Sequence, residues 1–68
     1  MSWKDILKDN GFVWDEDQEL YVKKLGFGRK ATVWMFMRGL FIVELNKKTI
    51  FDGYITNKEE FINIIKSV

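Results

Sequence analysis

The stretch ATVWMFMRGLFIVEL, residues 31–45, contains two nearly continuous apolar segments and decides the fold of the chain. Residues 31–37 and 40–45 are rich in aromatic and β-branched side chains, which favour β-strands. Arg38-Gly39 between them predicts a two-residue turn. We therefore expect the two segments to pair as an antiparallel hairpin at the centre of a sheet.

This turn also predicts the register of the hairpin. It places Met35 opposite Ile42, Met37 opposite Leu40 and Val33 opposite Glu44. The other face then carries Trp34, Phe36, Phe41, Val43 and Leu45. Both faces are thus apolar, whereas an antiparallel sheet usually packs one face and exposes the other to water. Helices can cover one face, so we expect the second to meet a folded-back strand, a second copy or another partner.

Further strands are expected on both sides of this hairpin. Residues 12–14 and 19–25 predict a second hairpin around the polar turn 15–18. After residue 45, the polar segment 46–48 predicts another turn, and residues 49–55 predict a further strand. These segments follow one another closely, so they indicate a meander of antiparallel strands.

Helices are expected at the two ends of the sheet. Ser2 is a candidate N-cap with Asp5 three residues later, and Gly11 is suited to the left-handed residue that ends a helix. The sequence TNKE at residues 56–59 predicts a capping box, with Thr56 as N-cap, for a second helix. The apolar stripe of this second helix is formed by Phe61, Ile64, Ile65 and Val68.

The resulting fold class is α+β. Residues 1–68 are expected to form a single domain: a small antiparallel β-meander of four to five strands, with a short N-terminal helix and a C-terminal helix. A domain of this size buries little surface, so its stability depends on apolar packing. Hydrophobic residues make up 47% of the chain, which is enough to build such a core.

The composition argues against catalysis and against the common metal sites. The chain contains no Cys and no His, so a thiol nucleophile, an imidazole base and the usual zinc ligands are absent. A domain this small also rarely encloses a pocket for a substrate. We therefore expect no enzymatic activity, no cofactor and no metal ion.

The segment LGFGRKATV, residues 25–33, resembles the glycine-rich loop of protein kinases, which also joins two antiparallel strands. The resemblance implies nucleotide binding, but it covers only this segment and departs from the family at Ala31, where a third Gly is expected. No V-A-I-K, H-R-D or D-F-G motif follows. We therefore expect Gly26 and Gly28 to supply positive φ angles in a wide hairpin turn, without nucleotide binding.

Charge is unevenly distributed along the chain, although the net charge is only +1. Residues 1–20 carry two Lys and six acidic residues, a net charge of −4, whereas residues 21–48 carry seven basic residues and one Glu, a net charge of +6. Lysines at strand edges keep a small sheet soluble. Basic residues interleaved with aromatics, as in residues 21–38, are also typical of single-strand binders. Residues 54–66 are similar to the last strand and helix of some single-strand-binding proteins.

The interpretation that we favour is a small non-catalytic protein-binding module acting through an apolar, aromatic sheet face. It would be a homodimer, or an inhibitor or adaptor of the kind common in phages and mobile elements. The alternative is a single-stranded nucleic-acid-binding protein that uses residues 21–38. The candidate partner-binding residues are Trp34, Phe36, Phe41, Val43, Tyr21, Lys23, Lys24, Arg29, Lys30 and Arg38. No apolar run is long enough to span a membrane and no signal peptide opens the chain, so we expect a cytoplasmic protein without a membrane partner.

Overall fold

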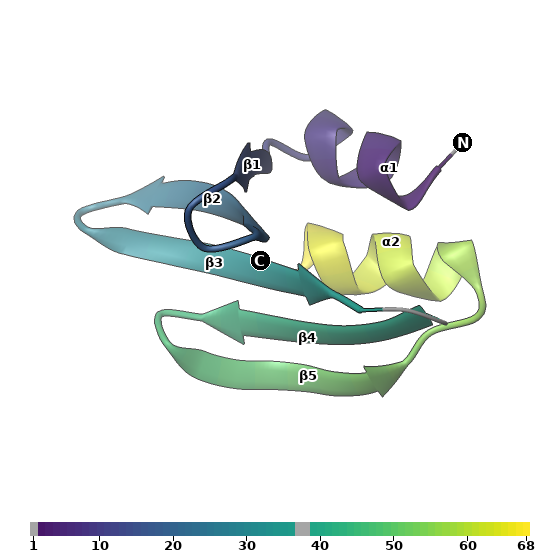
Figure 1. Ribbon diagram of the computed structural model, residues 1–68. Helices are drawn as coiled ribbons and strands as arrows, with labels where there is room; N and C mark the ends of the chain where they lie inside the picture. Colours follow the sequence, from purple (N-terminus) through teal and green to yellow (C-terminus); the bar gives the residue numbers. More distant parts are fainter. Residues whose placement is uncertain (1, 37–38) are drawn as a thin grey trace.

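The computed structural model describes residues 2–36 and 39–68 as five strands and two helices (Figure 1). In chain order they are α1 (Trp3–Asp9), β1 (Val13–Asp15), β2 (Leu20–Gly26), β3 (Arg29–Met35), β4 (Leu40–Leu45), β5 (Lys48–Tyr54) and α2 (Lys58–Lys66). Met37 and Arg38, which belong to the expected central hairpin, lie outside the described residues.

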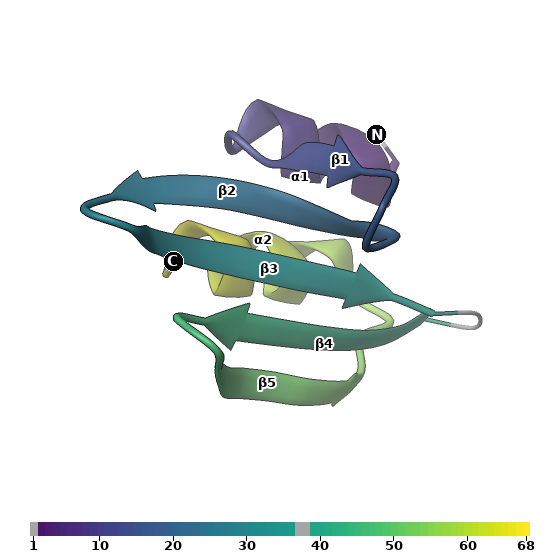
Figure 2. The same cartoon turned by 60° about the vertical axis from the view of Figure 1, so that its left-hand side comes forward.

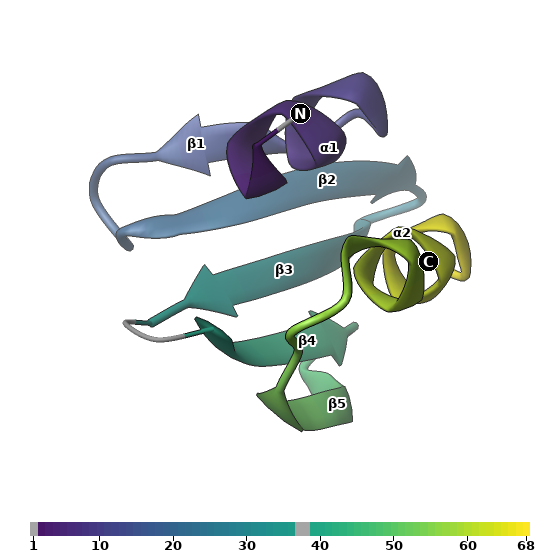
Figure 3. The ribbon, with the colours of Figure 1, turned by 90° about the vertical axis from the view of Figure 1, so that its right-hand side faces the viewer.

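The strands form one antiparallel sheet in the order β1-β2-β3-β4-β5, so every strand pairs with its neighbour in the sequence. Figure 3 shows both helices on the same side of this sheet. The expected fold class, an antiparallel meander with a helix at each end, is confirmed. One face of the sheet is therefore packed by helices, and we call the other the open face.

The core lies between the helices and the sheet. Three aromatic rings join the two layers: the Phe41 ring of β4 lies 4.8 Å from the Phe61 ring of α2 and 5.3 Å from the Trp3 ring of α1, centroid to centroid. Trp3 and Phe61 pack edge to face at 4.9 Å. Such tilted and edge-to-face contacts are the favoured geometries of aromatic pairs. The buried core residues are Ile6, Leu7, Phe12, Tyr21, Ala31, Val33, Phe41, Val43, Ile55, Phe61 and Ile65.

The ends of α1 follow the expected pattern. Ser2 and Asp5 form a capping box, because the Ser2 side chain accepts a hydrogen bond from the Asp5 N–H while the Asp5 carboxylate accepts one from the Ser2 N–H. At the other end, Gly11 has a φ of +88°. The N–H groups of Gly11 and Phe12 donate to the carbonyls of Lys8 and Leu7, as in a Schellman motif.

The expected cap of α2 was wrong by one residue. The N-cap is Asn57, whose side-chain oxygen accepts a hydrogen bond from the Glu59 N–H at 2.8 Å, and not Thr56. Asn and Thr are both good N-caps, so local sequence alone does not choose between neighbours. The predicted apolar stripe is present: Phe61 and Ile65 are fully buried.

The glycine-rich segment forms a tight turn and not the wide one that we expected. Gly26 pairs with Arg29, which leaves only Phe27 and Gly28 in the loop between β2 and β3. Both loop residues have positive φ, +54° and +75°, as a type I′ hairpin requires. The glycines thus supply positive φ, as predicted, but Phe27 adopts it as well.

The register of the β3–β4 hairpin differs by one residue from the expected one. Val33 pairs with Val43 and Trp34 with Ile42, whereas the sequence led us to expect Val33 opposite Glu44. A shift of one residue moves every side chain of one strand to the other face. As a result, Phe41 and Val43 face the helices, and Ile42 joins Trp34 on the open face.

Candidate functional site

The open face carries a contiguous set of apolar side chains. Trp34 of β3 and Phe36 directly after it alternate with core residues, and so they point away from the helices. Ile42 pairs with Trp34, and the Phe36 N–H donates to the Leu40 carbonyl at 2.8 Å. Leu40 pairs in turn with Tyr54 of β5. We name Trp34, Phe36, Leu40, Ile42 and Tyr54 the apolar strip.

Two aromatic side chains of the apolar strip stack on each other, and the strip is partly exposed to solvent. The rings of Trp34 and Phe36 stack with an interplanar angle of 12° and a centroid distance of 6.2 Å. Phe36 is 46% exposed and Tyr54 is 68% exposed, although both are large apolar side chains. An exposed apolar patch on the free face of a sheet is characteristic of a binding surface.

Toward the start of β3, at Arg29, the apolar strip borders polar and charged groups. Trp34 lines a hollow of about 160 Å³ together with Lys30, Lys47 and Glu44. The Thr32 hydroxyl, at the floor of this region, lies 3.4 Å from a Glu44 carboxylate oxygen and can donate to it. Trp34 therefore lies at the boundary between apolar and basic surface, and Glu44 offsets part of the positive charge.

Beyond this hollow the surface becomes strongly basic. Lys24 of β2 pairs directly with Lys30 of β3, an arrangement of like charges that destabilises a sheet. Arg29, Lys30 and Lys47 line a second hollow of about 290 Å³ beside Gly28. Asn46 links the two turns here, because its side-chain oxygen accepts from the Lys30 N–H at 3.1 Å and its N–H donates to the Lys30 carbonyl. We name Lys24, Arg29, Lys30 and Lys47 the basic end.

The structure brings together only part of the predicted partner-binding set. Trp34, Phe36, Lys24 and Lys30 share the open face, and Arg29 lies at the end of the hairpin. Tyr21, Phe41 and Val43 are instead buried in the core, with 4%, 2% and 0% of their surface exposed, so their assignment to a binding surface was wrong. Arg38 lies outside the described residues.

Lys23 also faces the helices and not a partner. Its ammonium group lies 5.9 Å from the centroid of the Phe12 ring, within the range of a cation–π interaction. It also donates to the carbonyl of Val68 at 3.5 Å. Lys23 therefore helps to tie the C-terminal end of the chain to β2, and its predicted role in binding is not supported by its position.

Sequence reasoning missed four residues of the exposed surface. Leu40 and Ile42 were assigned to the opposite face because the expected register was off by one residue. Tyr54 follows from the same correction, because its open-face position is defined by its pairing with Leu40. Phe27 lies in the aromatic and basic segment 21–38 of the alternative interpretation, but it was not among the candidate partner-binding residues, because the turn that contains it was expected to be wide. A phenylalanine between two glycines was the signal for a tight, exposed tip.

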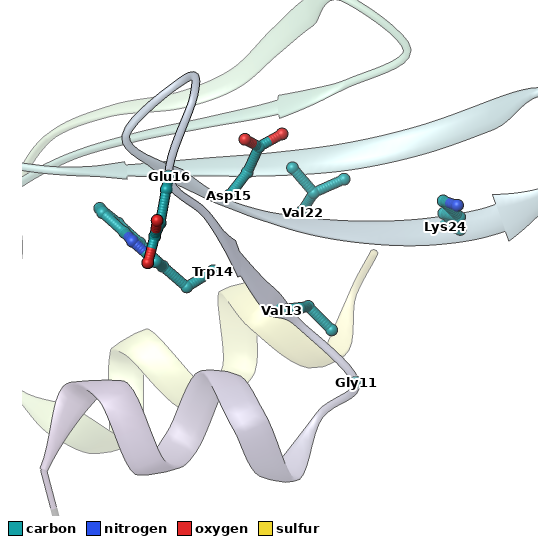
Figure 4. A pocket seen from close by; sticks show the side chains of 7 residues that line it. All are labelled: Gly11, Val13, Trp14, Asp15, Glu16, Val22 and Lys24. Carbon is teal, nitrogen blue, oxygen red and sulfur yellow. The ribbon is translucent and has the colours of Figure 1, made fainter.

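A hollow of about 600 Å³ runs along the edge of the sheet at β1 (Figure 4). Val13 and Val22, a cross-strand pair, lie beside each other there, and Lys24 lies farther along β2. Trp14 points to the other side of β1, where its ring contacts Tyr21 at 5.1 Å. Of the predicted partner-binding residues, only Lys24 lines this hollow.

The carboxylate of Asp5 is held by the cap of α1. Hydrogen bonds from the side chain and backbone of Ser2 lower the pKa of Asp5 below its ordinary value, which is the consequence of the helix cap. In the described part of the chain, no group of three or more His, Cys, Asp or Glu side chains is placed to hold a metal ion. Neither of the two described helices is long and apolar enough to cross a membrane.

Comparisons with protein-family models, with curated proteins and with solved structures found no match to this chain. Its function must therefore be inferred from its own surface. The two features that distinguish this surface are the apolar strip and the basic end, which adjoin at Trp34 on the open face.

Proposed function

We propose that this chain is a small non-catalytic protein-binding module whose apolar strip contacts an apolar protein surface. The observation that carries the proposal is the stacked pair of Trp34 and Phe36 on the open face. Aromatic side chains held in place by their neighbours are favoured anchors of protein interfaces, because they bury a large area with little loss of conformational freedom. An inhibitor or adaptor role in the cytoplasm, in a bacterium or a phage, fits such a module.

The same strip supports self-association. A two-fold homodimer would pack the open faces of two copies against each other and remove Phe36 and Tyr54 from water. The core of a 68-residue domain is small, so burial of a second face would add to its stability. We therefore propose that the isolated protein forms a homodimer unless a different protein covers the strip.

Sedimentation equilibrium of three proteins tests this function: the unchanged chain, Trp34→Ala and Ile50→Ala. Ile50 is a matched control, because it is 42% exposed but lies at the bulge of β5, outside the apolar strip. We expect association at high micromolar concentration for the unchanged chain and for Ile50→Ala, and a folded monomer for Trp34→Ala, with a melting temperature lowered because the stabilisation by association is lost. A monomer in all three cases contradicts self-association.

An affinity capture with the same variants tests binding to another protein. Partners that use the apolar strip should be retained by the unchanged chain and by Ile50→Ala, lost with Trp34→Ala, and resistant to nuclease treatment of the lysate. Equal retention by all three variants would argue against the strip as the binding surface.

A second candidate function is single-stranded nucleic-acid binding. It is favoured by one observation: Trp34 lines the same hollow as Lys30 and Lys47. Proteins that bind single strands combine aromatic platforms for the bases with cations for the phosphates. A gel shift with single-stranded oligonucleotides at low salt tests this candidate, and no shift at tens of micromolar protein would contradict it.

A further inference from the structure

The tip of the β2–β3 hairpin presents an unusual side chain to solvent. Phe27 occupies the apex of the two-residue turn and is fully exposed, with a relative accessibility of 105%. Its φ of +54° lies in the left-handed region, which disfavours residues other than Gly, Asn and Asp. Asn, Asp and Gly are the usual residues of such turns. Phe27 thus disfavours folding in two ways: its backbone adopts a positive φ, and its apolar ring is exposed to water.

The surroundings of Phe27 leave its ring free to contact a ligand. Apart from the adjacent residues in the chain, no atom lies within 4 Å of the position that a Cβ would take at Gly26 or at Gly28, so the tip is open on both sides. In Figures 1 and 2 the β2–β3 hairpin extends beyond the β4–β5 turn. Nothing within the described fold therefore offsets the exposure of this aromatic ring.

The charges behind the tip favour an anionic ligand. Lys24 and Lys30 lie directly opposite each other, and Arg29 and Lys47 line the adjoining hollow. Residues 21–43 contain no acidic residue, and Glu44 lines the hollow beside Trp34 but not the one beside Gly28. A phosphate placed between these cations would remove their mutual repulsion, so an anion stabilises the arrangement that the sheet itself disfavours.

We infer that the end of the β2–β3 hairpin is a binding site for single-stranded nucleic acid, in which Phe27 stacks on a base and Lys24, Arg29, Lys30 and Lys47 contact phosphates. This inference rests on the second candidate function and names its principal aromatic residue. Stacking on an aromatic ring is tolerant of sequence because every base has a π face. The site therefore binds strands with little sequence preference.

The open face offers a continuous path for such a strand. β3 leads from Arg29 at the basic end to Trp34 in the apolar strip, roughly 17 Å at the usual rise of a strand. This distance corresponds to about five nucleotides at the spacing of a stacked strand. Phe27 and Trp34 thus provide aromatic platforms at either end of a segment that carries Arg29 and Lys30, with Lys24 and Lys47 beside it.

A phospholipid surface would satisfy the same cations less well. A polybasic patch attaches stably to a membrane only together with an inserted apolar group, and a single phenyl ring buries much less apolar area than an acyl chain. The neighbouring β4–β5 turn consists of Asn46 and Lys47 and adds no second apolar side chain at the tip. A single strand of nucleic acid can instead stack on Trp34 as well as on Phe27, so it explains why both aromatic rings are accessible.

Fluorescence anisotropy with a labelled twelve-nucleotide oligothymidine, at several salt concentrations, tests the inference. Phe27→Asn removes the ring but suits the turn, so the fold should be retained, and we expect binding to weaken by roughly 5- to 150-fold with the salt dependence unchanged. Lys24→Ala with Lys30→Ala should weaken binding and reduce the slope of log K against log salt by about 1.4. Lys4→Ala, on α1, serves as the matched control and should bind as the unchanged chain does.

The outcomes separate this inference from the function beneath it. If the unchanged chain binds the oligonucleotide and folded Phe27→Asn binds equally well, the inference is wrong while the second candidate function stands. If the unchanged chain fails to bind at low salt, both are wrong. Binding to vesicles containing phosphatidylserine that depends on Phe27, without oligonucleotide binding, would overturn the inference in favour of a membrane surface.

Discussion

At the scale of single residues, side chains near the ends of elements determine where those elements begin. Asn57 accepts a hydrogen bond from the Glu59 N–H and so satisfies one of the free donors at the start of α2. Thr56 directly precedes it, carries a similar acceptor and is exposed. Both residues match the N-cap preference, so which of them caps α2 depends on the path of the chain from β5 into the helix.

Replacement of Asn57 by Ala should lower the free energy of unfolding by about 1 kcal/mol, because the Glu59 N–H loses its partner. The matched variant Thr56→Ala should change it by less than about 0.5 kcal/mol, as for an exposed residue outside a cap. Urea denaturation followed by circular dichroism measures both. A larger loss for Thr56→Ala than for Asn57→Ala would contradict the cap assigned here.

At the scale of elements, the pattern of side chains predicts where a strand lies in the sequence, but it does not predict the register of that strand with its neighbour. The strands from residue 13 to residue 54 lie close to their expected positions, since aromatic and β-branched residues favour extended backbone. The register of β3 and β4 depends on the length of the loop between them. The Phe36 N–H donates to the Leu40 carbonyl, whereas the turn expected at Arg38-Gly39 placed Met37 opposite Leu40, and this difference of one residue exchanged the two faces of β4.

The two faces of this hairpin should respond differently to the loss of an aromatic ring. Phe41→Ala removes a ring that is 2% exposed and should destabilise the protein by about 3–5 kcal/mol. Phe36→Ala removes one that is 46% exposed and should cost about 1 kcal/mol or less in the monomer. Urea denaturation at low protein concentration checks both. Similar losses for the two variants would contradict the observed register.

At the scale of the whole molecule, the aromatic contacts of Trp3, Phe41 and Phe61 join both ends of the chain to the central strands. The helices are short, seven and nine residues, so they depend on these contacts more than on intrinsic helix stability. Neither of the two described helices covers the open face, so Phe36 and Tyr54 stay exposed there.

Phe61→Ala should destabilise the domain by about 3–5 kcal/mol, because Phe61 is fully buried between α1, α2 and the sheet. This is a large fraction of the total stability expected for so small a domain, so partial unfolding at 25 °C is expected. Ile62→Ala is the neighbouring control, only partly buried, and should cost less. An unchanged melting temperature for Phe61→Ala would show that α2 does not pack as described.

Local sequence determined the α+β class, the meander order, the ends of α1 and the positive φ of Gly26 and Gly28, because these depend on side-chain alternation, caps and turns between neighbouring residues. The tertiary structure decided which sheet face the helices cover. Burial removed Tyr21, Phe41 and Val43 from the candidate site, and register added Leu40, Ile42 and Tyr54 to it. The physical reason is that side chains on both faces are apolar, so hydrophobicity alone cannot distinguish the core from the open face. A shift of one residue in the register exchanges the two faces of a strand, and only the tertiary structure determines that shift.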